Sequence, residues 1–129
     1  MRRRFIHLEE FCLNLPGAYM AQPWGPDTTV FQVDGRIFAM PSPANHAVLS
    51  VAAKVSREFR EAHREHPATY VPAYVGRFGW LGIRITDDET WDMATAAIEE
   101  SYALVRGNGR GRTRARRPPR APGPPDRAS

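Results

Sequence analysis

The sequence predicts a two-layer α+β domain, in which helices cover one side of an antiparallel sheet. Short β-branched and aromatic runs come in pairs joined by tight turns, which is typical of antiparallel hairpins. Three segments with apolar residues at helical spacing lie before, between and after these runs. The expected order of elements is therefore α-β-β-β-α-β-β-α, without an internal repeat.

The first half of the chain supplies one helix and three strands. Apolar residues at helical spacing predict a helix over residues 4–14, which Pro16-Gly17 ends. Both central residues of a type I′ turn need positive φ, so Asp34-Gly35 favours that turn. Strands are expected on either side of this turn and after the following loop, over residues 28–33, 36–40 and 47–53.

The second half begins with a short helix and a hairpin. Ser56 can cap a helix over residues 57–66, and Pro67 stops it. Two strands are expected next, over residues 70–75 and 80–85, and Pro72 makes the first of them an edge strand. Period-two alternation places the aliphatic residues of this hairpin on one face. The other face receives the aromatic and basic set, which consists of Tyr70, Tyr74, Trp80 and Arg84.

The last helix is expected to begin at Asp87 or Asp88, since either residue can act as its N-cap. Its core stripe consists of Trp91, Ala94, Ile98, Tyr102 and Val105. Gly107 is expected to cap its C-terminus. The Arg-, Pro- and Gly-rich sequence beyond it buries too little apolar surface to offset its ordering entropy. The chain is therefore expected to contain a domain, residues 1–106, and a disordered tail, residues 107–129.

The net charge of +4 is unevenly divided between these two parts. Residues 107–129 hold seven arginines and one acid, a net charge of +6. Residues 1–106 hold 11 basic and 13 acidic residues, a net charge of −2. The basic pI of the whole chain therefore describes the tail, and is poor evidence that the domain itself binds a polyanion.

The N-terminal residues argue against secretion. Arg2-Arg3-Arg4 is similar to the basic region of a signal peptide, but His7, Glu9 and Glu10 break the apolar run that should follow. No apolar stretch approaches the length of a membrane span, so we expect a cytoplasmic protein with no membrane partner. Cys12 is the only cysteine, which excludes an internal disulfide, and its helix pattern predicts a small buried side chain.

Motifs of catalysis and of cofactor binding are absent. There is no P-loop or nucleophile elbow, and the glycine-rich residues 107–111 are expected to be a helix cap and linker. His63 and His66 lie one helical turn apart and could face a metal, but a helix end explains them better because further ligands are lacking. We expect no enzyme activity, no cofactor and no metal.

The aromatic and basic face of the last hairpin suits nucleic acid. Flat aromatic side chains beside arginines can stack on bases and contact phosphates, and Arg77 lies at the hairpin tip. Alternatively, these aromatic residues pack under a helix or against Trp24, or form a dimer contact. The tail attracts any polyanion through counterion release, unless it serves only to keep the protein soluble.

Six motifs follow one another in an order and spacing that resemble the MmcQ/YjbR family over about residues 6–106. They are Leu13-Asn-Leu-Pro-Gly-Ala18, Pro23-Trp-Gly-Pro-Asp27, Val30-Phe-Gln-Val-Asp-Gly-Arg-Ile-Phe-Ala39, Glu65-His-Pro67, Val71-Pro-Ala-Tyr-Val-Gly-Arg-Phe-Gly-Trp80 and Ser101-Tyr-Ala-Leu-Val105. The resemblance implies a compact α/β fold similar to frataxin (CyaY) and secretion chaperones. It also implies DNA binding through a "double wing", for which the hairpins at Asp34-Gly35 and Arg77-Phe78 are the natural wings.

The chain departs from the family pattern at several positions. Many relatives have an acid at Met20 and a basic residue in the third strand, where Ala52 or Ala53 stands here beside Lys54. Some relatives have an Asn-Lys-Arg-His-Trp run before the last strand, where residues 76–80 of this chain are Gly-Arg-Phe-Gly-Trp. Iron binding in the frataxin fold relies on an acidic first helix, which here offers only Glu9 and Glu10, so iron is not expected.

Our first hypothesis is a non-enzymatic DNA-binding protein, as a monomer or a homodimer. The alternative is a domain that binds a small molecule or a protein through the same aromatic face, as a pocket or a dimer surface. The residues expected to contact nucleic acid are Arg36, Lys54, Tyr74, Arg77, Trp80, Arg84, Arg110, Arg112, Arg114, Arg116 and Arg117.

Overall fold

A computed structural model describes residues 2–26, 28–42, 47–72 and 79–111, without the side chains of residues 2, 3 and 107–111. It contains one six-stranded antiparallel sheet and three helices, which confirms the α+β prediction. Along the chain the elements are α1 (Arg2–Leu13), β1 (Tyr19–Ala21), β2 (Val30–Val33), β3 (Arg36–Pro41), β4 (Ser50–Lys54), α2 (Arg57–His63), β5 (Thr69–Tyr70), β6 (Trp80–Arg84) and α3 (Asp88–Gly111). The spatial order of the strands is β1-β2-β3-β4-β6-β5.

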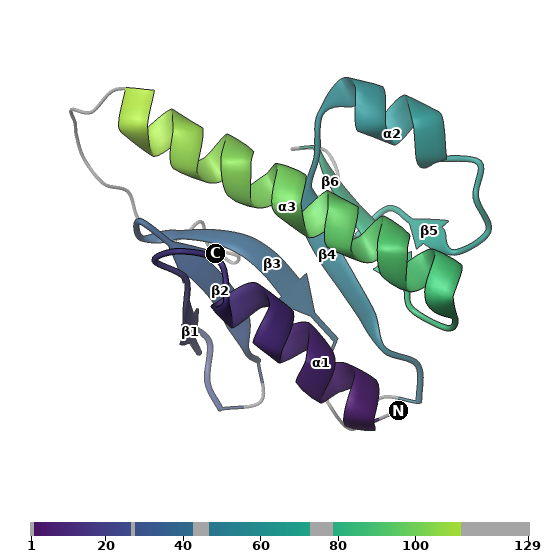
Figure 1. The fold of residues 1–129 in the computed structure, drawn as a ribbon, viewed down its shortest axis with the longest axis horizontal. Helices are drawn as coiled ribbons and strands as arrows, with labels where there is room; N and C mark the ends of the chain where they lie inside the picture. Colours follow the sequence, from purple (N-terminus) through teal and green to yellow (C-terminus); the bar gives the residue numbers. More distant parts are fainter. Residues whose placement is uncertain (1, 27, 43–46, 73–78, 112–129) are drawn as a thin grey trace.

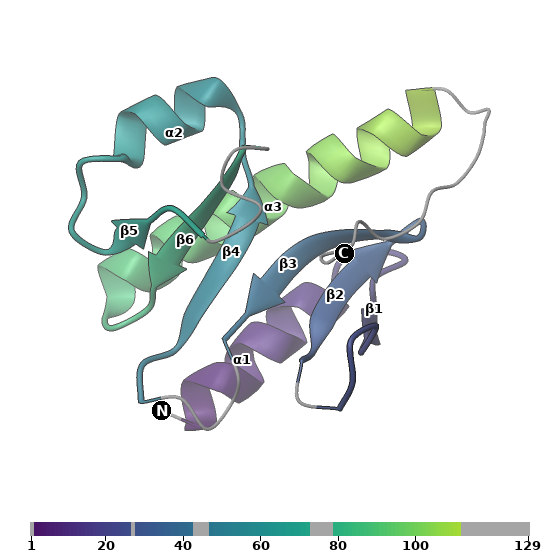
Figure 2. The same ribbon diagram turned by 180° about the vertical axis from the view of Figure 1, so that it is seen from behind.

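The helices lie unevenly about the sheet. Helices α1 and α3 pack on one face, and α2 lies beyond the end that holds β5 and β6 (Figure 1). Seen from behind, the strands lie in front of α1 and α3, and no described helix covers that second face (Figure 2). None of the helices in the described ranges combines the length and the apolar character that crossing a membrane requires.

The core lies between the sheet and the two long helices. From α1 it receives Leu8 and Cys12, both fully buried, and from α3 it receives Ala94 and Ile98. The alternation predicted for the last strand is confirmed. Leu81, Ile83 and Ile85 are at most 4% exposed, whereas Arg84 between them is exposed.

Local turn and cap chemistry also matches the sequence. Asp34 and Gly35 have φ values of 55° and 79°, as the predicted hairpin turn requires. Ser56 caps α2, since its hydroxyl accepts a hydrogen bond from the Phe59 amide at 3.0 Å. Asp87 caps α3, since its carboxylate accepts a hydrogen bond from the Thr90 amide at 2.9 Å.

Several elements differ from the prediction. Strand β5 is Thr69–Tyr70 where a strand was expected over residues 70–75, and Val71, expected on its buried face, is 77% exposed; residues 73–75 lie outside the described residues. Strand β4 is Ser50–Lys54 and not residues 47–53.

Strand β1, which pairs with β2, was not expected, because three residues give too little alternation to detect. Helix α2 ends at His63, where the chain turns and the amide of His66 donates to the carbonyl of His63. Helix α3 continues to Gly111, so Gly107 is not its C-cap. A glycine inside a helix costs only about 1 kcal/mol and does not by itself end it.

The pairing of β3 with β4 is short, and where it ends a serine of α3 forms hydrogen bonds to both strands. The two strands pair from Pro41 and Val51 to Ala39 and Ala53, and then diverge beneath α3 (Figures 1 and 2). The fully buried Ser101 hydroxyl accepts a hydrogen bond from the Lys54 amide at 3.0 Å and donates one to the Phe38 carbonyl at 2.7 Å. Ser101 thereby replaces a ladder bond.

Two residues after Lys54, just beyond the end of β4, α3 makes a second such contact. The Glu100 carboxylate accepts a hydrogen bond from the Ser56 amide at 2.8 Å. Together, Glu100 and Ser101 hold the C-terminal end of β4 against α3. This end carries Lys54, and its position is therefore set by α3 as well as by the sheet.

Candidate functional site

The sheet surface opposite α1 and α3 brings together the basic and aromatic side chains of β4, β5 and β6. Val51, Ala53, Leu81 and Ile83 are buried against the helices, so the residues that alternate with them lie on the other side. We call this other side the open face, and it consists of Ser50, Ala52, Lys54, Tyr70, Trp80, Gly82 and Arg84.

Strand register pairs these residues across the open face. Lys54 lies directly opposite Trp80, and Ser50 lies directly opposite Arg84 at the other end of the β4–β6 ladder. Residues directly opposite each other in an antiparallel pair have Cβ atoms about 5 Å apart. The two ends lie four positions apart, a distance of about 13 Å along the strand.

The side chain of Tyr70, a residue of β5, extends over the neighbouring strand β6. It lies opposite Gly82, and a Cβ atom at residue 82 would overlap its ring. Beyond Gly82, the Tyr70 hydroxyl donates a hydrogen bond to the Ser50 hydroxyl at 2.9 Å. The ring therefore spans from β5 over β6 to β4, where the amide of Ser50 is itself bonded to the Ser42 hydroxyl at 2.9 Å.

The Tyr70 ring holds the guanidinium of Arg84. The Arg84 Cζ atom lies 4.7 Å from the ring centroid, within the range of a cation–π contact. No acid in the described part of the chain forms a salt bridge with Arg84 or with Lys54. Both ends of the open face therefore carry a cation beside an aromatic ring, without a neutralising carboxylate among the described residues.

Charge is segregated between the sheet and the longest helix. The six strands contain Arg36, Lys54 and Arg84 and no acidic residue. Helix α3 contains five acids, which are Asp88, Glu89, Asp92, Glu99 and Glu100. The net charge of −2 over residues 1–106 thus combines an acidic helix with basic strands.

The structure brings together three of the residues predicted to contact nucleic acid: Lys54, Trp80 and Arg84. Arg36 is separate from them. It lies directly opposite Val33, so the two side chains are on the same side of the sheet, and this is the side on which Val33 is buried in the core. The Nη1 atom of Arg36 is buried without a hydrogen-bond partner among the described residues. The remaining predicted contacts lie outside the described residues, namely Tyr74, Arg77, Arg112, Arg114, Arg116, Arg117 and the side chain of Arg110.

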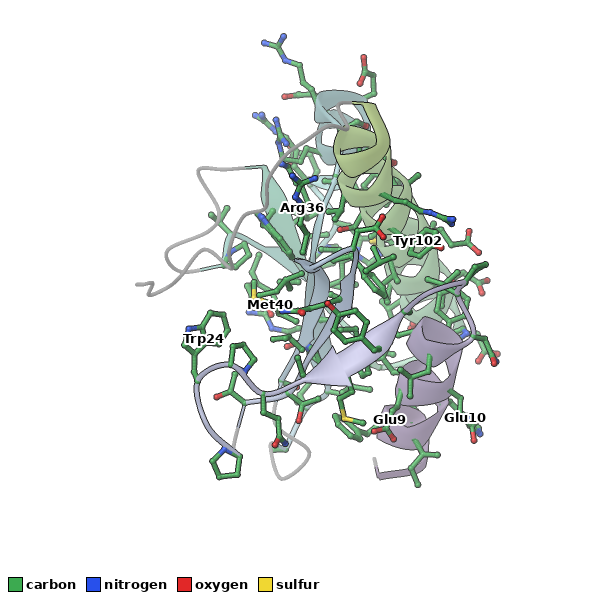
Figure 3. All side chains as sticks on the ribbon, turned by 90° about the vertical axis from the view of Figure 1, so that its left-hand side faces the viewer. Glu9, Glu10, Trp24, Arg36, Met40 and Tyr102 are labelled. Carbon is green, nitrogen blue, oxygen red and sulfur yellow. The ribbon has the colours of Figure 1, made fainter. Side chains whose placement is uncertain are left out.

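Two residues of the surface could not be found from local patterns. Ser50 belongs to the open face only because β4 pairs with β6, and Met40 borders the open face because it lies opposite Ala52. Met40 and Trp24 lie on the side of the sheet away from Tyr102 and the helices (Figure 3). Only the register between strands places these two residues there, and that register is set by contacts between residues distant in the sequence.

The other candidate groups have structural explanations. His63 bonds to the Phe59 carbonyl at 2.9 Å, whereas His66 contacts the Ala68 amide and, at 3.4 Å, Glu89, so the two rings have different partners. Within the described ranges, no three His, Cys, Asp or Glu side chains gather as metal ligands would. Burial, assisted by the charge of Glu9, raises the pKa of Cys12 to about 12, which keeps this thiol protonated and unreactive.

Comparisons with known proteins identify a family and two solved structures of similar fold. A family model described as YjbR matches residues 13–104. The crystal structure of a Deinococcus radiodurans protein with a DUF419 domain has a TM-score of 0.69 and 23% identity, covering 81% of this chain and 80% of that chain. A Pseudomonas syringae protein has a TM-score of 0.60 and 20% identity, covering 81% and 98%. No curated protein matches the chain.

Proposed function

The chain belongs to the YjbR family, and on that premise we propose that it is a non-enzymatic, cytoplasmic DNA-binding protein whose open face contacts nucleic acid. The observation that carries this proposal is the pairing of a cation with an aromatic ring at both ends of the β4–β6 ladder, Lys54 with Trp80 and Arg84 with Tyr70. Aromatic rings stack on bases and cations contact phosphates, so both halves of the interaction are present.

The strand composition supports this partner. A polyanion is repelled by carboxylates, and the strands that form the open face contain none. Anchoring of Tyr70 by Ser50 keeps the Arg84 guanidinium in place before any ligand arrives. A preorganised group loses less conformational entropy on binding than a free one does.

Two further parts of the chain add positive charge. The connection between β5 and β6 contains Tyr74 and Arg77, and we assign the nearer of the two wings to it. Beyond Gly111, six arginines form a basic tail that strengthens binding without sequence preference: Arg112, Arg114, Arg116, Arg117, Arg120 and Arg127.

The salt dependence of DNA binding tests the proposal, and it needs a full-length chain in which these six arginines are replaced by serine. If the tail contacts about four phosphates, neutralising it should reduce the log–log salt slope by roughly 3 to 4. In that background, Lys54→Gln and Arg84→Gln should each weaken binding and remove about one further unit of slope. The matched control is Arg57→Gln, an exposed arginine on α2, which should change neither quantity.

Two results would overturn the proposal. Unchanged affinity and slope in Lys54→Gln and Arg84→Gln would show that the open face is not the contact. Failure of the full chain to bind DNA at any moderate salt concentration would reject DNA binding altogether. In that case the same face should be tested as a small-molecule pocket or a dimer surface.

A further inference from the structure

The width of the sheet limits which form of nucleic acid can reach the open face. Six paired strands have five spacings between them, which makes the sheet about 24 Å wide at about 4.8 Å a spacing. The major groove of B-DNA is about 12 Å wide and admits a helix or a two-stranded ribbon. Strands β4 and β6 lie inside the sheet, between β3 and β5, so the side chains of the open face do not fit into a groove.

Helices α2 and α3 do not offer a substitute for a groove-reading element. The longest helix, α3, exposes acids at Asp88, Asp92 and Glu99, which would repel phosphates along its length. Helix α2 has only seven residues, with two glutamates among them. Recognition of a duplex by a helix in the major groove therefore has no suitable candidate in these two helices.

A single strand meets the open face without these difficulties. Its bases are not held in a duplex stack, so they can lie on aromatic side chains while its phosphates meet the adjacent cations. Trp80 beside Lys54 provides one such position, and Arg84 on Tyr70 provides another about 13 Å away along β6. A strand running along β6 would meet both pairs.

We infer that the ligand of the open face is single-stranded nucleic acid, bound by stacking on Trp80 and by phosphate contacts to Lys54 and Arg84. This inference rests on the proposed function and gives it a substrate class. Stacking has no requirement for a particular base, so the preference is for strandedness and only weakly for sequence.

The test compares two probes on the full-length protein with its six tail arginines replaced by serine. One probe is a fluorescein-labelled 20-nucleotide strand without self-complementarity, and the other is the same strand annealed to its complement. Fluorescence anisotropy should show that the single strand binds about tenfold or more tightly than the duplex does. Trp80→Leu should weaken binding of the single strand by about 5- to 100-fold, the range expected for one lost stack. Trp80→Phe should retain most of the affinity.

Two controls keep the result interpretable. Trp91→Leu removes a tryptophan of α3 that packs against Phe11 of α1, on the other side of the sheet, and should leave the affinity unchanged. Lys54→Gln tests the same end of the site without altering an aromatic residue. Thermal unfolding followed by circular dichroism should show that each variant is folded.

The outcomes separate this inference from the proposed function. Equal or tighter binding of the duplex, with loss of affinity in Trp80→Leu, would overturn the single-strand preference and leave the open face as the DNA contact. Binding of the single strand that neither Trp80→Leu nor Lys54→Gln weakens would overturn both claims about the open face. Absence of binding to either probe would overturn the proposed function itself.

Discussion

The ring of Tyr70 lies on Gly82, in the space that any larger residue at position 82 would fill. Gly82 does not have a positive φ, so the backbone does not require glycine there. What requires it is the passage of Tyr70 over β6 to its hydrogen bond with Ser50. This contact connects the outermost strand to β4 and fixes the surface on which Arg84 rests.

Replacing Gly82 with Ala should therefore displace Tyr70 and destabilise the protein by about 1–2 kcal/mol, through overpacking and loss of one hydrogen bond. In a Tyr70→Ala background the same substitution should cost much less, because the obstructing ring is gone. Urea unfolding of the two single variants and the double variant gives the coupling free energy between the residues. Additive effects would show that the Tyr70 ring does not occupy this space in solution.

Ser101 should contribute strongly to stability, because it satisfies the Lys54 amide and the Phe38 carbonyl where β3 and β4 separate. Ser101→Ala leaves both groups without this partner in a fully buried position, and we expect a loss of about 1–3 kcal/mol. Thr95→Ala on the same helix is the control, since its hydroxyl makes only an exposed bond to the Asp92 carbonyl. Equal effects of the two substitutions on the free energy of unfolding would contradict this role.

Local patterns in the sequence were sufficient for most elements. Alternation in residues 80–85 predicted which residues are buried, and Asp34-Gly35 and Ser56 predicted a turn and a helix start from their own chemistry. These features depend on interactions between residues close in the chain. The very short strand β1 was missed because its three residues carry almost no periodic signal.

The candidate site was predicted only in part, because its assembly depends on strand register. Trp80 and Arg84 were placed on one face by alternation, but their partners Lys54 and Ser50 come from a strand about thirty residues earlier. The face of the sheet on which Arg36 lies depends on its pairing with Val33, and the register between β2 and β3 shifts nearby, between Phe31 and Gln32. A shift of one residue moves a side chain to the other face, and nothing local reveals it.

Cys12 should be inert in the folded protein, as its predicted burial implies. The side chain is fully buried and its pKa is about 12, so at pH 8 only about one thiol in ten thousand is ionised. Ellman's reagent should therefore react with the native protein only as fast as the protein opens, and at once in guanidinium chloride. Immediate stoichiometric reaction without denaturant would show that α1 does not protect this residue.

Asp87 should make the protein sensitive to acid. Hydrogen bonds from the amide and then the hydroxyl of Thr90 lower its pKa below the ordinary value of 3.8. The unfolded state therefore takes up the proton first, so the stabilising contribution is complete above about pH 5 and is lost as the pH falls through the folded-state pKa.

Asp87→Asn keeps an N-cap without a titrating group, so its stability should fall less between about pH 5 and pH 2 than that of the original protein. Asp92→Asn, an exposed acid one turn further along α3, is the control and should retain the original pH dependence. Urea midpoints measured across this range supply the comparison. Identical acid sensitivity in the protein and in Asp87→Asn would contradict the assignment.

Contact between the open face and nucleic acid is visible residue by residue in the NMR footprint of an oligonucleotide on the isotope-labelled full-length protein with its six tail arginines replaced by serine. The largest shifts should fall on Lys54, Gly82, Arg84 and the indole N–H of Trp80, while exposed residues of α3 such as Ala96 and Ala103 stay unchanged. Shifts concentrated on α1 or α3, with the open face unaffected at saturation, would contradict it.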